Sequence, residues 1–270
     1  MSLTASTNTT ANTALRYLSQ NSAASANSLA KLSSGSRIVK ASDDAASLAV
    51  GTKIKADVTA LKQANVNASQ ATSVLQVADG ALSQVTDILM RMKALAAQSM
   101  SGSVGATERG FINTEFQQLN TQIAQIGVQT KFNGEELLDG TYNQSFQVGV
   151  AATDTIGVNL SAIDLSAVAP GGDVLNQTTA ATASGAIDTA INTINTSRAN
   201  VGALISRFEF ASANVANTIE NLDAARSVLM DVDMAAEMSN FSSKQVMLQA
   251  SVAMLAQANQ QPQQLLRLLN

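Results

Sequence analysis

The chain has no cysteine, no histidine and no tryptophan among its 270 residues. Without cysteine it forms no disulfide and offers no thiolate as a nucleophile or metal ligand. Without histidine it lacks the side chain that most often serves as a general base and as a transition-metal ligand. We therefore expect no cofactor, no bound metal and no enzymatic activity.

Charged and aromatic residues are also scarce, at 13% and 3% of the chain, and the formal net charge is −4. No basic stretch predicts binding to nucleic acid or to an anionic membrane. No apolar run approaches the roughly 20 residues of a membrane-spanning helix, and the first residues lack the pattern of a cleaved secretion signal. Composition alone would indicate a cytoplasmic protein, unless the chain leaves by a route that needs no cleaved signal.

Apolar spacing predicts long helices. From Asp44 to about Ser101 the chain reads as one helix, which at a rise of 1.5 Å per residue would be about 85 Å long. Its apolar stripe consists of Val74, Val77, Ala81, Val85, Ile88, Met92 and Leu95. A second stripe with alternating spacings of three and four runs through Ile187, Ile191, Ile194, Arg198, Val201, Ile205, Phe208, Ser212, Val215, Ile219, Leu222, Arg226 and Leu229.

The middle of the chain combines a predicted helix with turn, strand and loop signals. A helix is expected where Ile112, Phe116 and Ile123 share a face, and Asn133-Gly134 and Asp139-Gly140 are turn signals. Alternating apolar residues then predict a small β-hairpin at about 140–165. The Pro, Gly and Thr-rich segment at about 166–184 reads as a loop.

Both ends of the chain are predicted to be helical. Leu15, Leu18, Leu29 and Leu32 follow the heptad spacing of a coiled coil. Gly35 is the expected C-cap of this helix, and Ser42 or Asp43 the N-cap of the next. A last helix runs from about Asp233 to the end.

The expected fold is mainly α. It is an elongated antiparallel long-helix bundle or coiled coil with a small β-hairpin region and with the N- and C-termini paired at one end. We expect residues 1–42 and 231–270 to form a terminal helical coiled coil that is disordered in the monomer. Residues 43–230 are expected to form a rod domain.

Three groups of residues invite a chemical interpretation. The acidic pairs Asp43-Asp44 and Asp231/Asp233 suit a hard cation or acid–base chemistry, but both lie where helices begin, which favours capping. Methionines at helical spacing favour packing over a metal or peptide site. Arg91 and Glu115 are expected on separate helices, as an intramolecular pair, an interface pair or, by default, two solvated charges.

The C-terminal helix carries two apolar stripes about 100° apart. The first consists of Phe241, Leu248, Val252, Leu255, Leu266 and Leu269, and the second of Met247, Ala250, Met254, Ala258, Leu265 and Leu268. Two stripes call for two partners. The N-terminal helix provides one, and we predict that the second is another molecule. An ordinary four-helix bundle is the alternative, although the chain ends hold few large residues to fill its core.

Several motifs resemble bacterial flagellin: LSSGSRI followed by SDDAA, the NASQATSVLQVADGALSQVTDILMRMKALAAQS segment, TKFNG, and the closing LAQANQQPQQLLRLL. The resemblance covers residues 1–150 and 185–270, so the chain looks like a short member without large outer domains. The hook–filament junction protein of the same superfamily is the alternative, although LAQANQ with Pro262 and the closing leucines favours flagellin.

The resemblance implies a structural subunit of the helical flagellar filament, which serves motility. Such subunits are exported unfolded, without a cleaved signal peptide, and reside outside the cell. The implied partners are other flagellin subunits, an export chaperone at the C-terminal helix, the export apparatus, and hook-associated and cap proteins. The expected assembly residues are Leu15, Leu18, Leu29, Leu32, Arg91, Leu95, Glu115, Phe241, Met247, Leu248, Val252, Met254, Leu255, Leu265, Leu266, Leu268 and Leu269.

Two segments depart from the family pattern. The family's R-I-N-S-A-K-D-D-A-A-G reads here as R-I-V-K-A-S-D-D-A-A-S, so the family's Asn is missing after Ile38. In the segment that animal innate-immune receptors recognise, Arg91, Leu95 and Glu115 match, but Met90 and Ala94 replace the family's Gln and Glu. Recognition by these receptors is therefore doubtful.

Overall fold

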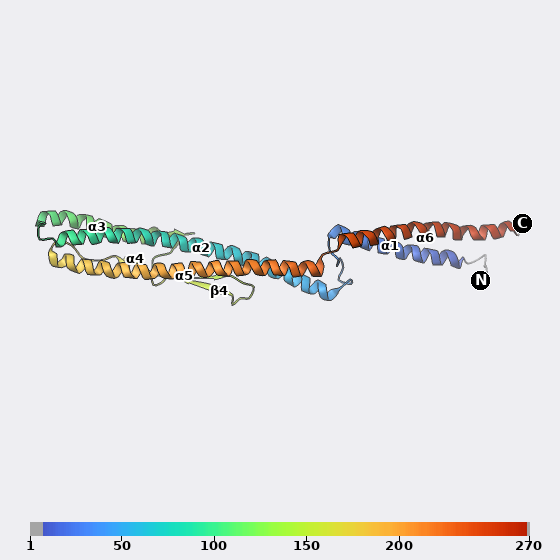
Figure 1. Cartoon of the computed structure of the whole chain (residues 1–270), viewed down its shortest axis with the longest axis horizontal. Helices are drawn as coiled ribbons and strands as arrows, with labels where there is room; N and C mark the ends of the chain where they lie inside the picture. Colours follow the sequence, from blue (N-terminus) through green and yellow to red (C-terminus); the bar gives the residue numbers. More distant parts are fainter. Residues whose placement is uncertain (1–7, 269–270) are drawn as a thin grey trace. The chain divides into compact units, whose positions relative to one another are not determined.

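The computed structural model describes the backbone of residues 8–268 and the side chains of residues 8–260. Long helices dominate, and two small antiparallel strand pairs lie between them in the chain (Figure 1). The elements are α1 (Thr9–Ser34), α2 (Ala45–Met100), α3 (Ala106–Gln129), β1 (Lys131–Phe132), β2 (Glu135–Glu136), β3 (Asn143–Gln147), β4 (Thr155–Asn159), α4 (Leu165–Val168), α5 (Gln177–Met230) and α6 (Met234–Leu268). The expected mainly α fold with a small β-hairpin is confirmed, and α2 is one uninterrupted helix as its stripe predicted.

The chain divides into two compact units. The terminal unit combines Met1–Ala56 with Asn221–Asn270, and the central unit is Asp57–Glu220. The helices α2 and α5 each contribute residues to both units. The sequence-based division into residues 1–42 with 231–270 and residues 43–230 stays a prediction. No helix in the described part of the chain is both long and apolar enough to cross a membrane.

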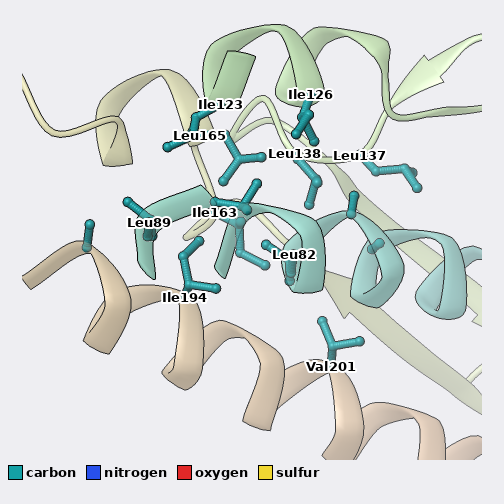
Figure 2. Close-up of a cluster of buried hydrophobic side chains, with 14 of the residues drawn as sticks. Leu82, Leu89, Ile123, Ile126, Leu137, Leu138, Ile163, Leu165, Ile194 and Val201 are labelled. Atoms are coloured by element: carbon teal, nitrogen blue, oxygen red, sulfur yellow. The ribbon is translucent and has the colours of Figure 1, made fainter. Parts of the chain in front are cut away.

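The core of the central unit surrounds α2. Figure 2 shows Leu82 and Leu89 of α2 with Ile194 of α5 on one side and Ile123 of α3 on the other. Because α2 is covered from two sides, it buries a second row of leucines beside the predicted stripe. Val77, which the stripe placed inside, is 42% exposed, whereas the neighbouring Leu75 is fully buried.

Polar pairs interrupt the apolar row between α2 and α5. Nε of Arg198 donates to Oδ1 of Asp79 at 2.9 Å, and the Ser212 hydroxyl donates to Oδ1 of Asn65. Arg198 and Ser212 are two of the polar residues in the predicted α5 stripe. A polar contact within an apolar row favours one register, because sliding the helices would separate the paired groups. The Arg198 and Asp79 side chains are 37% and 39% exposed, so water also reaches them and the preference is modest. These pairs therefore favour the observed alignment of α2 and α5.

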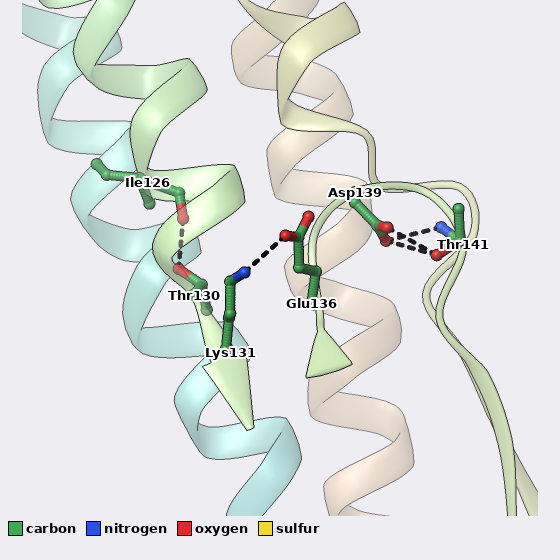
Figure 3. Close-up of polar contacts among 6 residues, drawn as sticks. All are labelled: Ile126, Thr130, Lys131, Glu136, Asp139 and Thr141. Atoms are coloured by element: carbon green, nitrogen blue, oxygen red, sulfur yellow. Dashed lines mark hydrogen bonds and ion pairs between the residues drawn. The ribbon is translucent and has the colours of Figure 1, made fainter. Parts of the chain in front are cut away.

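The first strand pair is a two-residue hairpin at the predicted Asn133-Gly134 turn. Asn133 has φ 51° and Gly134 φ 88°, as a tight hairpin turn requires. Figure 3 shows the Lys131–Glu136 ion pair at 2.8 Å, which closes the strands. It also shows the Thr130 hydroxyl donating to the Ile126 carbonyl at 2.6 Å, where α3 ends.

The second strand pair packs on the helices. β3 and β4 are antiparallel, with Asn143 opposite Asn159 and Gln147 opposite Thr155. Ile156 and Val158 are buried, and the ring of Phe146 meets that of Phe208 edge-on at 5.9 Å between centroids. The predicted alternation thus turns one face of this hairpin toward α5.

The segment 166–184, expected as a loop, is partly helical. The short helix α4 lies at its start, and α5 already begins at Gln177. Oδ1 of Asn176 accepts a hydrogen bond from the Thr179 backbone N–H at 2.9 Å, which caps α5. Ala180 and Ala183 are buried, so packing outweighs the weak helix propensity of the Thr and Ser residues around them.

Aspartates shape the helix starts, in the capping role that the sequence favoured. Asp44 rather than Ser42 or Asp43 caps α2: its Oδ1 accepts from the Ser47 N–H at 3.0 Å. Asp43 instead accepts from the backbone N–H groups of Val39 and Lys40 in the preceding turn. Asp233 accepts from two N–H groups at the start of α6. The hydroxyl and backbone N–H of Ser47 hold the pKa of Asp44 below its ordinary value.

Replacing Phe116 by Ala should destabilise the central unit by about 3–5 kcal/mol, because this ring of α3 is fully buried. Urea denaturation followed by circular dichroism measures the loss. Phe111→Ala is the matched control, since Phe111 lies on the same helix and is 73% exposed, and it should cost less than about 1 kcal/mol. Equal losses in the two variants would contradict the placement of the core.

Asp44→Asn should make the chain less stable at pH 7 and leave its stability unchanged at low pH. Asn caps a helix about as well as Asp, so this change removes mainly the charge. A carboxylate with a lowered folded-state pKa stabilises above its unfolded pKa of about 4, and the contribution is lost as the pH falls through the folded pKa. Urea titrations of both proteins between pH 7 and pH 2 measure this. A difference that persists undiminished at pH 2 would refute the charge effect.

Candidate assembly interface on the terminal helices

In the terminal unit, α1 and α6 lie side by side and run in opposite directions (Figure 1). The α1 helix begins where Oδ1 of Asn8 accepts from the Ala11 N–H at 3.0 Å, and it ends at Gly35, whose φ is 69°. Nδ2 of Asn8 donates to the Ala258 carbonyl at 2.9 Å. Hydrogen bonding therefore ties the first residues of α1 to the C-terminal half of α6.

The other end of the pair is held by backbone contacts. The Val232 N–H donates to the Gly35 carbonyl at 3.0 Å, and the Arg37 N–H donates to the Met230 carbonyl at 2.8 Å. A Cβ added at Gly51 of α2 would lie 2.6 Å from Sδ of Met230. The absence of a side chain at Gly51 thus lets α2 approach the end of α5 at this point.

The contact between α1 and α6 uses mainly small and polar residues. Nδ2 of Asn21 donates to the Ser251 hydroxyl at 3.0 Å within it. Buried or half-buried residues at heptad spacing are Ala11, Ala14, Leu18, Asn21, Ser25, Ser28 and Leu32 on α1, and Glu237, Phe241, Lys244, Leu248, Ser251, Leu255 and Ala258 on α6. Small side chains allow helix axes to approach closely, which leaves larger neighbours outside the contact.

The rows of residues that were predicted to join α1 to α6 were therefore misplaced by one residue at several positions. Leu15 and Leu29 of α1 are 48% and 55% exposed, and Val252 of α6 is 53% exposed. Leu18, Leu32, Phe241, Leu248 and Leu255 do lie on the contact and are half-buried. The sequence pattern predicted that leucines face α6 because they are large and apolar. In the hydrogen-bonded register, Ala14, Asn21 and Ser28 face α6 instead.

One flank of the pair forms an open groove of about 490 Å³, the assembly groove. Its walls are Thr10, Thr13, Ala14, Tyr17 and Asn21 of α1 and Met247, Ala250, Ser251 and Met254 of α6. The Met247 and Met254 side chains are 39% and 63% exposed. Among the residues whose side chains the structure describes, the second predicted stripe of α6 is thus largely uncovered, apart from Ala258, which lies on the contact with α1.

The opposite flank exposes further apolar residues. Helical periodicity places Leu15 and Leu29 of α1 on this side, together with Met238 and Val252 of α6. The hydrogen-bonded register brings Leu15 level with Val252, and Leu29 level with Met238. Apolar side chains therefore flank the small-residue contact on both sides.

The remaining predicted assembly residues have other surroundings. Leu95 is 2% exposed in the core of the central unit, which removes it from any surface that another molecule can reach. Nη2 of Arg91 lies 2.7 Å from Oε1 of Glu115, so these residues form an intramolecular pair between α2 and α3. The side chains of Leu265, Leu266 and Leu268, and the whole of Leu269, lie outside the described residues.

Sequence reasoning missed Tyr17, which lies in the assembly groove with the Arg16 guanidinium 5.5 Å from its ring centroid. The heptad of small residues through Ala11, Ala14 and Ser28 would have indicated the side of α1 that faces α6. Tyr17 lies beside that row. Within the described residues, no three acidic, histidine or cysteine side chains are grouped so that they could hold a metal ion.

Two family models match the chain. The bacterial flagellin N-terminal helical region matches residues 5–143, and the bacterial flagellin C-terminal helical region matches residues 184–269. A flagellin of Halalkalibacterium halodurans is 43% identical over 88% of this chain and 89% of its own length. A flagellin of Bacillus subtilis is 38% identical over 94% and 96%. A Treponema maltophilum flagellar filament 30.7 kDa core protein is 36% identical over 89% and 90%.

Solved structures agree with these matches. Bacillus cereus flagellin is 32% identical with a TM-score of 0.52, over 60% of this chain and 94% of that one. A putative flagellar hook-associated protein of Vibrio parahaemolyticus has a TM-score of 0.59 over 70% of this chain and 99% of that one. At 15% identity it shows a shared fold alone. With both family models covering most of its length, the chain belongs to the bacterial flagellin family.

Proposed function

We propose that this chain is a structural subunit that polymerises with copies of itself into an extracellular, helical flagellar filament used for motility. The observation that carries the proposal is the pair of exposed apolar flanks on α1 and α6, which no described residue of the chain covers. Relatives named as filament core proteins support the same role. The role is structural rather than catalytic.

Neighbouring subunits would supply the second partner that α6 needs. Apolar surface gains roughly 25 cal/mol for each Å² removed from water, so covering Met247, Met254 and Tyr17 favours association. A contact between two different faces of identical subunits can be repeated from one subunit to the next, and it generates an open helix when the rotation between subunits does not close into a ring. The assembly groove and the flank of Leu15 and Leu29 are such different faces.

The terminal helices order on assembly in this proposal. Fixing a residue costs about 1–2 kcal/mol of conformational entropy, and the small residues between α1 and α6 bury little apolar area in return. The free subunit therefore keeps a folded central unit and a weakly held α1–α6 pair. An export chaperone would cover α6 before export, and the export apparatus, the cap and the hook-associated proteins would be the other partners.

A hook–filament junction protein is the second candidate. It would attach in a short layer and stop, whereas a filament subunit continues to add. Growth of purified protein from sonicated filament seeds, viewed by electron microscopy, distinguishes the two. Long filaments are expected, and short caps on every seed would favour the junction protein.

Ala250→Glu should block growth from seeds, because Ala250 lines the assembly groove and a neighbour would bury the new charge without a partner. The concentration needed for growth should rise by about tenfold or more, with the helix content of the free subunit unchanged. Ala253→Glu is the control, since it makes the same substitution on the exposed side of α6 between the two apolar flanks. Equal loss of growth in both variants would show that the groove is not the contact.

Limited proteolysis of the free subunit should remove residues from both ends and spare the middle of the chain. Cleavage is expected within residues 1–42 and 231–270, with mass spectrometry identifying the surviving fragment. The same protease should leave filaments largely intact, because neighbours then hold the terminal helices. If the ends of the free subunit resist as strongly as the middle, ordering does not depend on assembly.

A further inference from the structure

Four methionines of α6 have exposed side chains: Met234, Met238, Met247 and Met254. The chain has no cysteine, so thioethers are the most readily oxidised side chains that it presents. Met247 and Met254 differ from the other two because both line the assembly groove. Two oxidisable sulfur atoms therefore lie on the surface that polymerisation would cover.

We propose that the thioethers of Met247 and Met254 form a redox-sensitive site at which oxidation by peroxide prevents the addition of a subunit to the filament. The inference rests on the proposed function, because it treats the assembly groove as a contact between subunits. In the reaction a sulfur lone pair attacks one oxygen of hydrogen peroxide and the O–O bond breaks. That oxygen stays on sulfur as a sulfoxide, while the other leaves as water with both protons. The sulfur is oxidised and the peroxide is reduced.

Most hydrogen-bond donors of the groove are already engaged. The Thr10 hydroxyl donates to Oδ1 of Asn8 at 2.6 Å, and the Thr13 hydroxyl donates to the Thr9 carbonyl at 2.9 Å. The Ser251 hydroxyl donates to the Met247 carbonyl at 2.8 Å. The side-chain donors that remain in the groove are the Tyr17 hydroxyl and one N–H of the Asn21 amide, whose other N–H donates to the Ser251 hydroxyl.

A sulfoxide is a strong hydrogen-bond acceptor, and water satisfies it in the free subunit. Once a neighbour covers the groove, a sulfoxide oxygen that neither Tyr17 nor Asn21 reaches would be buried without a donor, which is costly. Oxidation therefore changes the free subunit little but opposes the contact between subunits. Conversely, a filament that covers the groove shields both sulfur atoms from peroxide.

Two methionines of α2 provide internal standards. Met90 is 53% exposed and Met92 is fully buried, and both belong to the central unit, whereas the assembly groove belongs to the terminal unit. Peroxide should oxidise Met90 in the free subunit and spare Met92. Oxidation at Met90 should leave growth unaffected, which separates a local effect in the groove from a general effect of sulfoxide formation.

The test treats free subunits with hydrogen peroxide, removes the excess with catalase, locates sulfoxides by peptide mass spectrometry and measures growth from filament seeds. Oxidised wild-type protein should need a concentration about tenfold higher or more to grow. The double variant Met247→Leu/Met254→Leu should grow equally well before and after treatment, because Leu is close to Met in volume. Met90→Leu should remain as sensitive as the wild type. Methionine sulfoxide reductases should restore growth of the oxidised wild type without any substitution.

Undiminished growth of subunits that carry sulfoxides at both positions would overturn the inference. Equal sensitivity of the double variant would do the same, and so would failure of the reductases to restore growth once mass spectrometry shows that both sulfoxides have been reduced. Untreated wild-type subunits that fail to extend seeds would overturn the proposed function itself, and this inference with it.

Discussion

The ion pair between Arg198 of α5 and Asp79 of α2 lies in a largely apolar row, and together with the Ser212–Asn65 hydrogen bond it favours one alignment of the two long helices. That alignment determines which side chains of α2 remain for α3 and the strands. The same helices meet again in the terminal unit, where Gly51 admits the Met230 side chain. The Met230 carbonyl there accepts hydrogen bonds from Ser36 and Arg37, which lie just beyond α1.

The helix contacts of the two units bury different kinds of residues. The central unit surrounds α2 with neighbours and buries large residues such as Leu82, Leu89 and Phe116 completely. Within the described residues of the terminal unit, α1 packs mainly against α6, and small and polar residues occupy most of that contact. Several of its large apolar side chains, among them Leu15 and Met254, are exposed. Such a subunit buries its large apolar residues in the central unit but leaves apolar residues exposed on α1 and α6.

The long helices could be predicted from the sequence, because apolar residues at alternating spacings of three and four indicate a helix with one buried side, whichever element packs against it. The start of α5 at Gln177 could not, since it depends on the burial of Ala180 and Ala183 by residues distant in sequence. The sequence predicted which two helices carry the candidate site, and Met247 and Met254 of its second stripe are exposed, while their part in assembly stays a prediction. Its register was missed at Leu15 and Leu29, because a heptad pattern ranks positions by apolar character. Hydrogen bonds such as Asn21–Ser251 decide which row faces the partner.

The hydrogen bond from Asn8 to Ala258 joins residues 250 positions apart in the chain. α1 lies near the start of the chain and its partner α6 at the end, with nearly every other residue between them. The residues of the central unit are contiguous in sequence, and domains generally fold as units. In a subunit that folds after export, the core of the central unit can therefore form while α1 still lacks its partner. A folded central unit leaves less open chain between the two helices, which lowers the entropic cost of bringing them together.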